Sequence, residues 1–265
     1  MKRIVFFDID GTLVDDATRI FPQSAKDAIA DLRAKGHLAV ISTGRPYTHI
    51  DPAVMTIPWD GCVSSCGQEV LAEGKLLYRS VPSPEQCARI RDLIRKCAMG
   101  GFYETDYGYC LDGNKPLPQE ALLEAERIQK NGLRVDYDPD REDFAFQKFI
   151  AYALPGCDRQ RFWQEASRDF NLIDRGGGMI EVVFARNTKA TGIARILEHF
   201  GLAGEDAAAF GDSTNDLAMF ACVKTPIAMD GSPGAVQEKA VYVTDTVLED
   251  GIAKGLKWLE SNLGE

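Results

Sequence analysis

The sequence predicts an α/β protein in which a Rossmann-like parallel-sheet core domain is interrupted by an inserted α+β module. Both ends of the 265-residue chain alternate short apolar strands with amphipathic helices, which is typical of a parallel sheet covered on both faces. The middle instead combines strong helices with strands of alternating apolar and polar residues, typical of a sheet with one open face. We therefore expect a core domain at 1–82 and 185–265 and an inserted module at 83–184.

Two short segments mark the expected junctions between these parts. Ser-Val-Pro-Ser-Pro occupies residues 80–84, and Ala-Arg-Asn occupies residues 185–187. Both resemble linkers, since proline and small polar residues favour irregular backbone. Paired linkers of this kind indicate a module inserted into a loop of the core rather than one continuous fold.

The first part of the chain begins with a near-continuous apolar run at residues 3–7, as expected of a buried strand. Residues 24–35 carry apolar side chains at helical spacing, and Gly36 follows as a helix-ending residue. Further strands are predicted at 37–42, 61–64, 69–71 and 75–81, the last two as a hairpin around Glu73-Gly74.

The last part of the chain resumes this alternation. Helices are predicted at 189–200, 215–221, 234–239 and 250–259. Strands are predicted at 207–210, 225–228 and 241–243.

The middle part differs in the kind of strand it contains. Helices are predicted at 85–96, 119–129 and 159–170, and amphipathic strands at 101–107, 146–153 and 179–184. Gly176-Gly177-Gly178 could cradle a phosphate, but no helix follows it, so a turn between two strands is the preferred interpretation.

The composition excludes several classes of function. The formal net charge of −10 argues against a nucleic-acid partner, which requires a basic surface. No apolar stretch is as long as a membrane span, and two aspartates interrupt the apolar run of the N-terminus where a signal peptide would continue. Seven scattered cysteines favour free thiols. We expect a cytoplasmic monomer or homodimer without membrane partners.

The strongest functional signal is Asp8-Ile9-Asp10-Gly11-Thr12, directly after the first predicted strand. In an open parallel sheet, the loops at the carboxyl ends of the strands form the active crevice. Asp and Gly are also common in ordinary turns. The position of the five-residue pattern at the end of a buried strand nevertheless favours a functional role for both carboxylates.

A second acidic segment, Gly211–Asp216, follows the predicted strand at 207–210 and begins a helix. Taken alone, Asp212 or Ser213 could simply cap that helix. Together with the first segment, however, it would bring four carboxylates into one crevice, and such a concentration of charge must be neutralised. Mg²⁺ is a hard cation that binds carboxylates, water and phosphate oxygens. We therefore expect a Mg²⁺ site formed by Asp8, Asp10, Asp212 and Asp216.

Further neutralisation would come from a lysine, backbone N–H groups and hydroxyls. The candidates are Lys189, at the start of a predicted helix, and Thr43-Gly44-Arg45, after the second predicted strand. For Lys189, a solvated helix face is the alternative. For Thr43-Gly44-Arg45, the alternative is a helix-entry turn, which Pro46 also favours and which is compatible with phosphate binding.

These segments resemble the signatures of the haloacid dehalogenase-like hydrolase superfamily, and within it the Cof-type sugar-phosphatase group with a type IIB cap. The four signatures occur in the order of that family: Asp8–Thr12, Ser42–Arg45, Lys189 and Gly211–Asp216. The resemblance covers essentially the whole chain, because the expected module lies between the second and third signatures, where that group carries its cap.

The resemblance implies a role for each matching residue. Asp8 would be the nucleophile that becomes an aspartyl phosphate, and Asp10 would protonate the leaving oxygen and then activate water. Thr43 would bind the transferring phosphoryl group, and Lys189 would stabilise its charge. Mg²⁺ would be held by Asp8, the backbone carbonyl of Asp10, and Asp212, with Asp216 and Asn215 in support. Gly44 and Arg45 would contact the substrate.

The implied activity is Mg²⁺-dependent hydrolysis of small phosphate monoesters, such as sugar phosphates, through an aspartyl-phosphate intermediate. One alternative is phosphoryl transfer to another sugar hydroxyl, as in the phosphomannomutase relatives. Another is a non-catalytic metabolite-binding protein, but such proteins usually lose the nucleophile or a metal ligand, and here all are present.

The inserted module is expected to close over the crevice and contact the leaving group through its open sheet face. Candidate specificity residues on its predicted strands are Tyr103, Asp106, Tyr109, Gln147 and Lys148. For each of them, an ordinary solvated position is the alternative.

Overall fold

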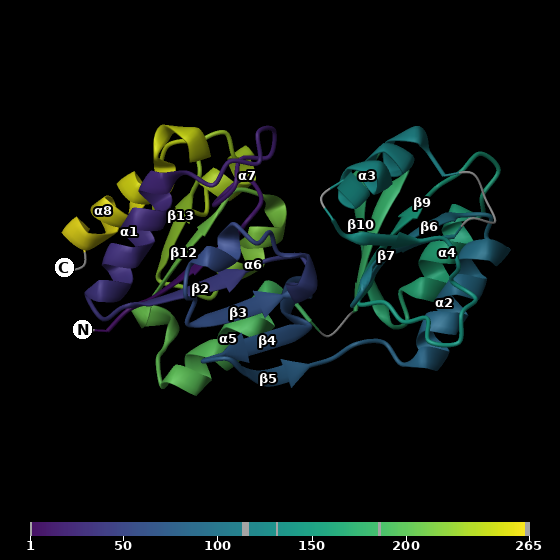
Figure 1. The fold of residues 1–265 in the computed structure, drawn as a ribbon, viewed down its shortest axis with the longest axis horizontal. Helices are drawn as coiled ribbons and strands as arrows, with labels where there is room; N and C mark the ends of the chain where they lie inside the picture. Colours follow the sequence, from purple (N-terminus) through teal and green to yellow (C-terminus); the bar gives the residue numbers. More distant parts are fainter. Residues whose placement is uncertain (1, 113–116, 131, 185–186, 263–265) are drawn as a thin grey trace. The chain divides into compact units, whose positions relative to one another are not determined.

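The computed structural model describes residues 2–112, 117–130, 132–184 and 187–262. The chain divides into two compact units (Figure 1): a core unit, Met1–Arg79 with Thr188–Glu265, and an inserted unit, Ser80–Asn187. Most of the second predicted linker, at 185–186, lies outside the described residues. Among the described residues, no helix combines the length and apolar character needed to cross a membrane.

The core unit is built on one eight-stranded sheet with the order β14-β13-β12-β1-β2-β3-β4-β5. Its strands are β1 (Ile4–Phe7), β2 (Leu38–Ser42), β3 (Gly61–Ser64), β4 (Glu69–Ala72), β5 (Lys75–Arg79), β12 (Ala207–Gly211), β13 (Thr225–Ala228) and β14 (Tyr242–Val243). The strands from β14 to β3 are parallel, and β4 and β5 form an antiparallel hairpin at one edge. The predicted α/β core with a parallel sheet is confirmed.

Helices cover both faces of this sheet. They are α1 (Gln23–Ala34), α5 (Lys189–Phe200), α6 (Leu217–Phe220), α7 (Gly234–Gln237) and α8 (Gly251–Asn262). Short 3-10 turns lie at Tyr47–His49, Val54–Thr56, Ser65–Gly67, Gly204–Asp206, Thr214–Asp216 and Val247–Glu249. Figure 1 shows α1 and α8 side by side on one face. Side chains of α5, α6 and α7 pack into a separate apolar cluster on the other face.

The central strand β1 is buried on both faces because its side chains alternate between two apolar clusters. Val5 and Phe7 point into the apolar cluster of α1 and α8, whereas Ile4 and Phe6 point into the cluster of α5 and α6. All four side chains are fully buried. Burying each one contributes about 1.5–3 kcal/mol, so the strand is fixed firmly and the residue that follows it is placed accurately.

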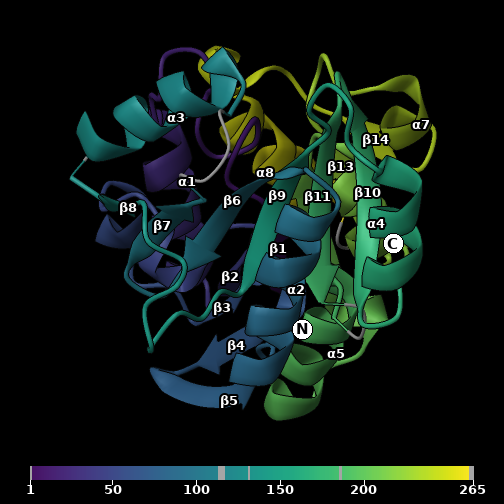
Figure 2. The ribbon, with the colours of Figure 1, turned by 90° about the vertical axis from the view of Figure 1, so that its right-hand side faces the viewer.

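The inserted unit contains a six-stranded sheet with the order β10-β11-β9-β6-β7-β8. Its strands are β6 (Gly100–Thr105), β7 (Gly108–Leu111), β8 (Arg134–Asp136), β9 (Lys148–Tyr152), β10 (Phe170–Gly176) and β11 (Met179–Phe184). Its helices are α2 (Pro84–Lys96), α3 (Gln119–Lys130) and α4 (Arg159–Ala166). Figure 2 shows α2 and α4 side by side against one face, while α3 packs on the other.

One helix of this unit is shorter than predicted, and some of its strands were not assigned from the sequence. The helix predicted at 159–170 ends at Ala166, and Phe170 begins the strand β10, which the prediction of a turn between two strands at Gly176–Gly178 implied without giving its range. Phe162, Ala166 and Phe170 keep helical spacing, and all three are buried in one apolar cluster. The spacing therefore could not reveal that the backbone changes conformation between them. The short strands β7 and β8 were also missed, whereas the turn at Gly176–Gly178 was predicted correctly.

Candidate active site

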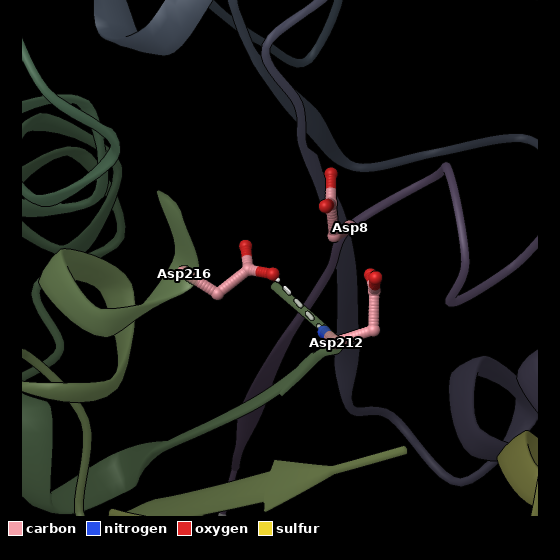
Figure 3. A group of neighbouring side chains, drawn as sticks. All are labelled: Asp8, Asp212 and Asp216. Atoms are coloured by element: carbon pink, nitrogen blue, oxygen red, sulfur yellow. Dashed lines mark hydrogen bonds between the residues drawn. The ribbon is translucent and has the colours of Figure 1, made fainter. Parts of the chain in front are cut away.

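Two neighbouring strands bring the acidic segments together. β1 and β12 are parallel and pair Phe7 with Phe210, so the residues that follow them emerge at the same end of the sheet. The backbone N–H of Asp8 donates to the carbonyl of Phe210 over 3.0 Å, which continues the pairing by one residue. Figure 3 shows that Asp8, Asp212 and Asp216 come together here. One carboxylate oxygen from each lies within 4.8 Å of the other two.

The carboxylate of Asp216 organises the loop after β12. Its Oδ2 atom accepts the backbone N–H groups of Asp212 and Ser213, over 3.0 and 3.1 Å. Ser213 is the N-cap residue of the turn that follows, and the side chain of Asp216 binds its backbone N–H, so a capping role for Ser213 and the carboxylate cluster occur together. The predicted helix at 215–221 is also divided, into the 3-10 turn Thr214–Asp216 and the short α6.

The first acidic segment is shaped to receive Asp212. The Oγ1 atom of Thr12 donates to Asp212 Oδ1 over 2.9 Å. Gly11 has a left-handed φ of +72°, and a Cβ atom at this position would lie 2.4 Å from Asp212 Oδ2. Only glycine allows this backbone conformation and this close approach. Thr12 received no role in the sequence analysis, although its place in the five-residue motif was a signal.

Lys189 is buried among these carboxylates. Its Nζ atom lies 2.6 Å from Asp216 Oδ1 and 2.9 Å from Asp8 Oδ1, and its side chain is 1% exposed. The alternative of a solvated helix face is therefore wrong. Burial alone would lower the pKa of Lys189, but the charges of Asp216 and Asp8 outweigh it and raise that pKa above its ordinary value. Lys189 therefore stays protonated and neutralises part of the negative charge of Asp8 and Asp216.

One lysine does not balance three carboxylates, of which Asp8 and Asp216 are buried and Asp212 is half-buried. Burial, followed by repulsion from Asp216, raises the pKa of Asp212 to about 7. The same two causes raise the pKa of Asp8 well above its ordinary value. Carboxylate anions this close together and this shielded from water are unfavourable unless a cation neutralises them. Asp8, Asp212 and Asp216 therefore form an all-oxygen donor set that fits a hard divalent cation.

The side chain of Asp10 is held separately from this group. Arg45 binds it through two N–H groups, with Nε 2.6 Å from Oδ2 and Nη2 donating to Oδ1. Arg19 adds a third hydrogen bond, from Nη1 to Oδ1 over 2.8 Å. Burial would raise the pKa of Asp10, but Arg45 and Arg19 outweigh it and hold that pKa below its ordinary value. Arg19 was missed because nothing in its local sequence sets it apart.

Thr43 and Arg45 follow β2, the neighbour of β1 on its other side. Thr43 is 1% exposed, and its Oγ1 atom accepts the backbone N–H of Arg45 over 3.1 Å. The loop after β3 holds this segment through backbone hydrogen bonds. The N–H of Ser65 donates to the carbonyl of Arg45, and that of Cys66 to the carbonyl of Thr43. Gly44 lies within this supported turn and is half-buried.

The supporting loop has an unusual backbone and also reaches Lys189. Ser65, Cys66 and Gly67 have consecutive left-handed φ values of 46°, 54° and 87°. A Cβ atom on Gly67 would lie 2.2 Å from the carbonyl oxygen of Thr188, the N-cap residue of α5. The loop therefore fixes the Thr43 segment and the start of the Lys189 helix together. Sequence patterns gave no indication of this.

Asn215 is half-buried, and its Oδ1 atom accepts a hydrogen bond from Ser213 Oγ over 2.7 Å. It thus lies in the loop that carries Asp212 and Asp216, as the motif implies.

The candidates in the inserted unit fall in different environments. Tyr103 does not lie on an open face: it is fully buried, and its ring packs against Phe144, Phe146 and Phe149. That interpretation was wrong because the preceding glycines made the strand's inward face hard to identify. Asp106 lies in the turn after β6 and accepts a hydrogen bond from Gln147 over 2.5 Å.

Lys148 and Tyr109 lie on the sheet face opposite to Tyr103. Lys148 forms ion pairs with Glu104 at 3.3 Å and Glu181 at 3.2 Å. Tyr109 packs beside the apolar cluster under α3. These are polar or amphipathic positions on the face that the sequence predicted to be open.

Comparison with known proteins agrees with this geometry. A family model described as haloacid dehalogenase-like hydrolase matches residues 5–256. A Bacillus subtilis protein named "Putative phosphatase YkrA" is 30% identical over 264 residues, covering 97% of this chain and 98% of that one. The Bacillus subtilis 5-amino-6-(5-phospho-D-ribitylamino)uracil phosphatase YcsE is 26% identical over 262 residues, covering 96% and 94%.

Solved structures show the same fold. A hypothetical protein of Geobacillus kaustophilus superimposes with a TM-score of 0.85 at 26% identity, over 98% of this chain and 99% of that one. A sugar phosphatase of HAD subclass IIB, BT4131, superimposes with a TM-score of 0.79 at 22% identity, over the same shares. The family model matches nearly the whole sequence, and the sheet brings the carboxylates of the family's signatures together. The chain therefore belongs to the haloacid dehalogenase-like hydrolases.

Proposed function

We propose that this protein is a Mg²⁺-dependent phosphatase that hydrolyses small phosphate monoesters through an aspartyl phosphate on Asp8. The observation that carries the proposal is the group of Asp8, Asp212 and Asp216, two of them buried and Asp212 half-buried, with one lysine shared between Asp8 and Asp216. The phosphatase names of the full-length relatives support it.

Asp8 is the nucleophile in this proposal. One of its oxygens attacks phosphorus, and the bond from phosphorus to the leaving oxygen breaks. Lys189, 2.9 Å from Asp8, neutralises charge that gathers around the transferring group. Asp8, Asp212 and Asp216 would hold Mg²⁺, which supplies charge neutralisation and orientation when bound. Thr43 and Gly44 would contribute hydrogen-bond donors to the phosphoryl oxygens, with Asn215 supporting the metal-binding loop.

Asp10 is the acid and base in this proposal. It donates a proton to the leaving oxygen and later accepts one from the water that hydrolyses the aspartyl phosphate. Arg45 pairs with Asp10 in the structure and belongs to the segment of Thr43. We infer that Arg45 turns to the phosphoryl group of the substrate, which removes one of the charges that keep the pKa of Asp10 low.

We propose small phosphorylated metabolites such as sugar phosphates as the substrates, acted on in the cytoplasm by a monomer or homodimer. The chain carries a net charge of −10, which favours compact, locally neutralised ligands over nucleic acid. We assign the choice of leaving group to the inserted unit, with Asp106, Tyr109, Gln147 and Lys148 as the remaining candidates.

The test is release of inorganic phosphate from a panel of phosphorylated metabolites, with Mg²⁺ and with a chelator. We expect Asp8→Asn and chelation each to abolish release without changing the melting temperature by more than a few degrees. Asp27→Asn, on the exposed face of α1, is the matched control and should leave activity unchanged. Turnover by Asp8→Asn at the wild-type rate would refute the mechanism. A phosphomannomutase-like transferase would instead require a sugar bisphosphate and release little phosphate.

A further inference from the structure

Arg19 contacts Asp10 from the same segment of the chain, nine residues further on. It lies between β1 and α1, whereas Arg45 follows β2. The Nη1 atom of Arg19 is 2.8 Å from Asp10 Oδ1, and the Arg19 side chain is 27% exposed. The pair is thus accessible to a substrate yet partly shielded from water, which strengthens a charged hydrogen bond.

The backbone around Arg19 is fixed in an uncommon conformation. Arg19 has a left-handed φ of 58°, which is unfavourable for a residue with a Cβ atom. Its N–H donates to the carbonyl of Asp15 over 2.9 Å, and the N–H of Asp15 donates to the carbonyl of Ile20 over 3.0 Å. The Asp15 carboxylate also accepts the N–H and the hydroxyl of Thr18. Left-handed residues held by such a network are often found where a side chain must be aimed.

The two arginines share Oδ1 of Asp10, whereas only Arg45 binds Oδ2. Arg19 binds Oδ1 alone, whereas Arg45 binds Oδ2 through Nε and Oδ1 through Nη2. If Arg45 turns to the substrate, Oδ2 loses that donor while Oδ1 keeps its bond to Arg19. The carboxylate would then stay oriented with Oδ2 directed to the leaving oxygen.

We propose that Arg19 is a positioning residue for the reaction: it keeps Asp10 aligned with the leaving group while Arg45 engages the substrate. This inference rests on the proposed function, in which Asp10 transfers the proton. Arg19 itself acts through Asp10 and makes no bond to reacting atoms.

The test uses the full-length protein with Mg²⁺ and two phosphate esters that differ in their leaving groups. The 4-nitrophenolate of 4-nitrophenyl phosphate leaves without a proton, whereas the alcohol of an alkyl phosphate such as glycerol phosphate needs one. We expect Arg19→Gln to lower kcat about 10- to 100-fold for the alkyl ester and less than about threefold for the nitrophenyl ester. The KM should stay within about twofold for both. Arg19→Lys, which keeps a charged donor, should recover most of the loss.

Two further variants separate this role from a structural one. Arg3→Gln is the matched control, because Arg3 is an arginine of the core unit that donates to the carbonyl of Glu205 at the surface. It should change neither kcat. In an Asp10→Asn background, Arg19→Gln should cause no further loss that depends on the leaving group, since the two residues act as a unit.

The role of Arg19 would be overturned if Arg19→Gln lowered kcat equally for both esters. It would also be overturned if Arg19→Gln lowered kcat for the alkyl ester as much in the Asp10→Asn background as in the wild-type protein. Absence of Asp8-dependent turnover in the wild-type protein would instead refute the proposed function, and the positioning role with it. Wild-type activity with unequal losses supports both.

Discussion

Replacing Asp212 by asparagine removes a half-buried carboxylate whose ionisation the folded protein opposes. Burial and the charge of Asp216 raise the pKa of Asp212 from 3.8 to about 7. Asparagine has nearly the same shape and keeps an oxygen that can accept the hydrogen bond from Thr12. The substitution therefore tests the electrostatic cost of this carboxylate with little change in packing.

The sign and size follow from linkage. A carboxyl group whose pKa is raised on folding binds more protons in the folded state, so stability falls as pH rises from the unfolded pKa to the folded one. One pKa unit corresponds to about 1.4 kcal/mol. Between pH 5.5 and pH 8 the wild-type protein should thus lose about 2 kcal/mol through Asp212, most of it below pH 7. The Asp212→Asn variant should not show this loss.

The assay is urea unfolding of the metal-free protein at pH 5.5 and pH 8, with Trp163→Phe in both backgrounds. Trp59 and Trp258 of the core unit then report on the relevant unit. The stability of Asp212→Asn relative to the parent should rise by about 2 kcal/mol between the two pH values. Saturating Mg²⁺ at pH 8 should stabilise the parent and not the variant. An identical pH dependence in both proteins would refute the reasoning.

Four other substitutions test three separate features. Gly67→Ala combines a left-handed φ with a Cβ atom 2.2 Å from the carbonyl of Thr188 and should lower the free energy of unfolding by more than about 3 kcal/mol. Gly74→Ala has a similar φ with nothing within 4 Å and should cost only about 1–2 kcal/mol in the same denaturation assay. The pKa of Glu181 is about 2, because a lysine and an arginine outweigh its burial. This depressed pKa contributes up to about 3 kcal/mol of stability that is present above about pH 4.5 and lost as pH falls towards 2. Glu181→Gln should therefore destabilise the protein more at pH 6 than at pH 3, and equal effects would contradict the ion-pair assignment. The Tyr103 hydroxyl is buried without a hydrogen-bond partner in the described part of the chain. Tyr103→Phe should thus raise stability by about 1 kcal/mol and leave kcat/KM unchanged across the substrate panel, whereas altered substrate preference would restore a role in specificity.

The sequence was sufficient to predict the core sheet because the signals there are local and redundant. Ile4–Phe7 is apolar at every position, and only a strand covered on both faces suits such a run. Lys189–Phe200 was predicted to the residue, since Thr188 caps the helix and Gly201 ends it in a left-handed conformation. The inserted unit was harder, because Phe170 satisfies a helical spacing while it begins a strand.

The candidate site was predictable only where it is carried by short motifs. Asp8 and Asp212 each follow an apolar strand, so the parallel sheet itself implies that they meet. Arg19 and the Ser65–Gly67 loop have no such signal, because their importance comes from hydrogen bonds that form only when the folded backbone brings them to Asp10 and to the Thr43–Arg45 segment. Contacts of this kind depend on the tertiary structure, which local patterns do not encode.

The order of the strands also determines when the protein can first become active during its synthesis. Ile4 pairs with Ala207, so the central strand lacks one neighbour until the chain beyond the inserted unit has been made. The inserted unit is one uninterrupted segment and can fold earlier, as contiguous domains generally do. A nascent or truncated chain that stops before Asp212 carries the proposed nucleophile without its acidic partners. Catalysis therefore waits until Asp212 and Asp216 have been made, and no fragment that ends before Asp212 should hydrolyse phosphate esters.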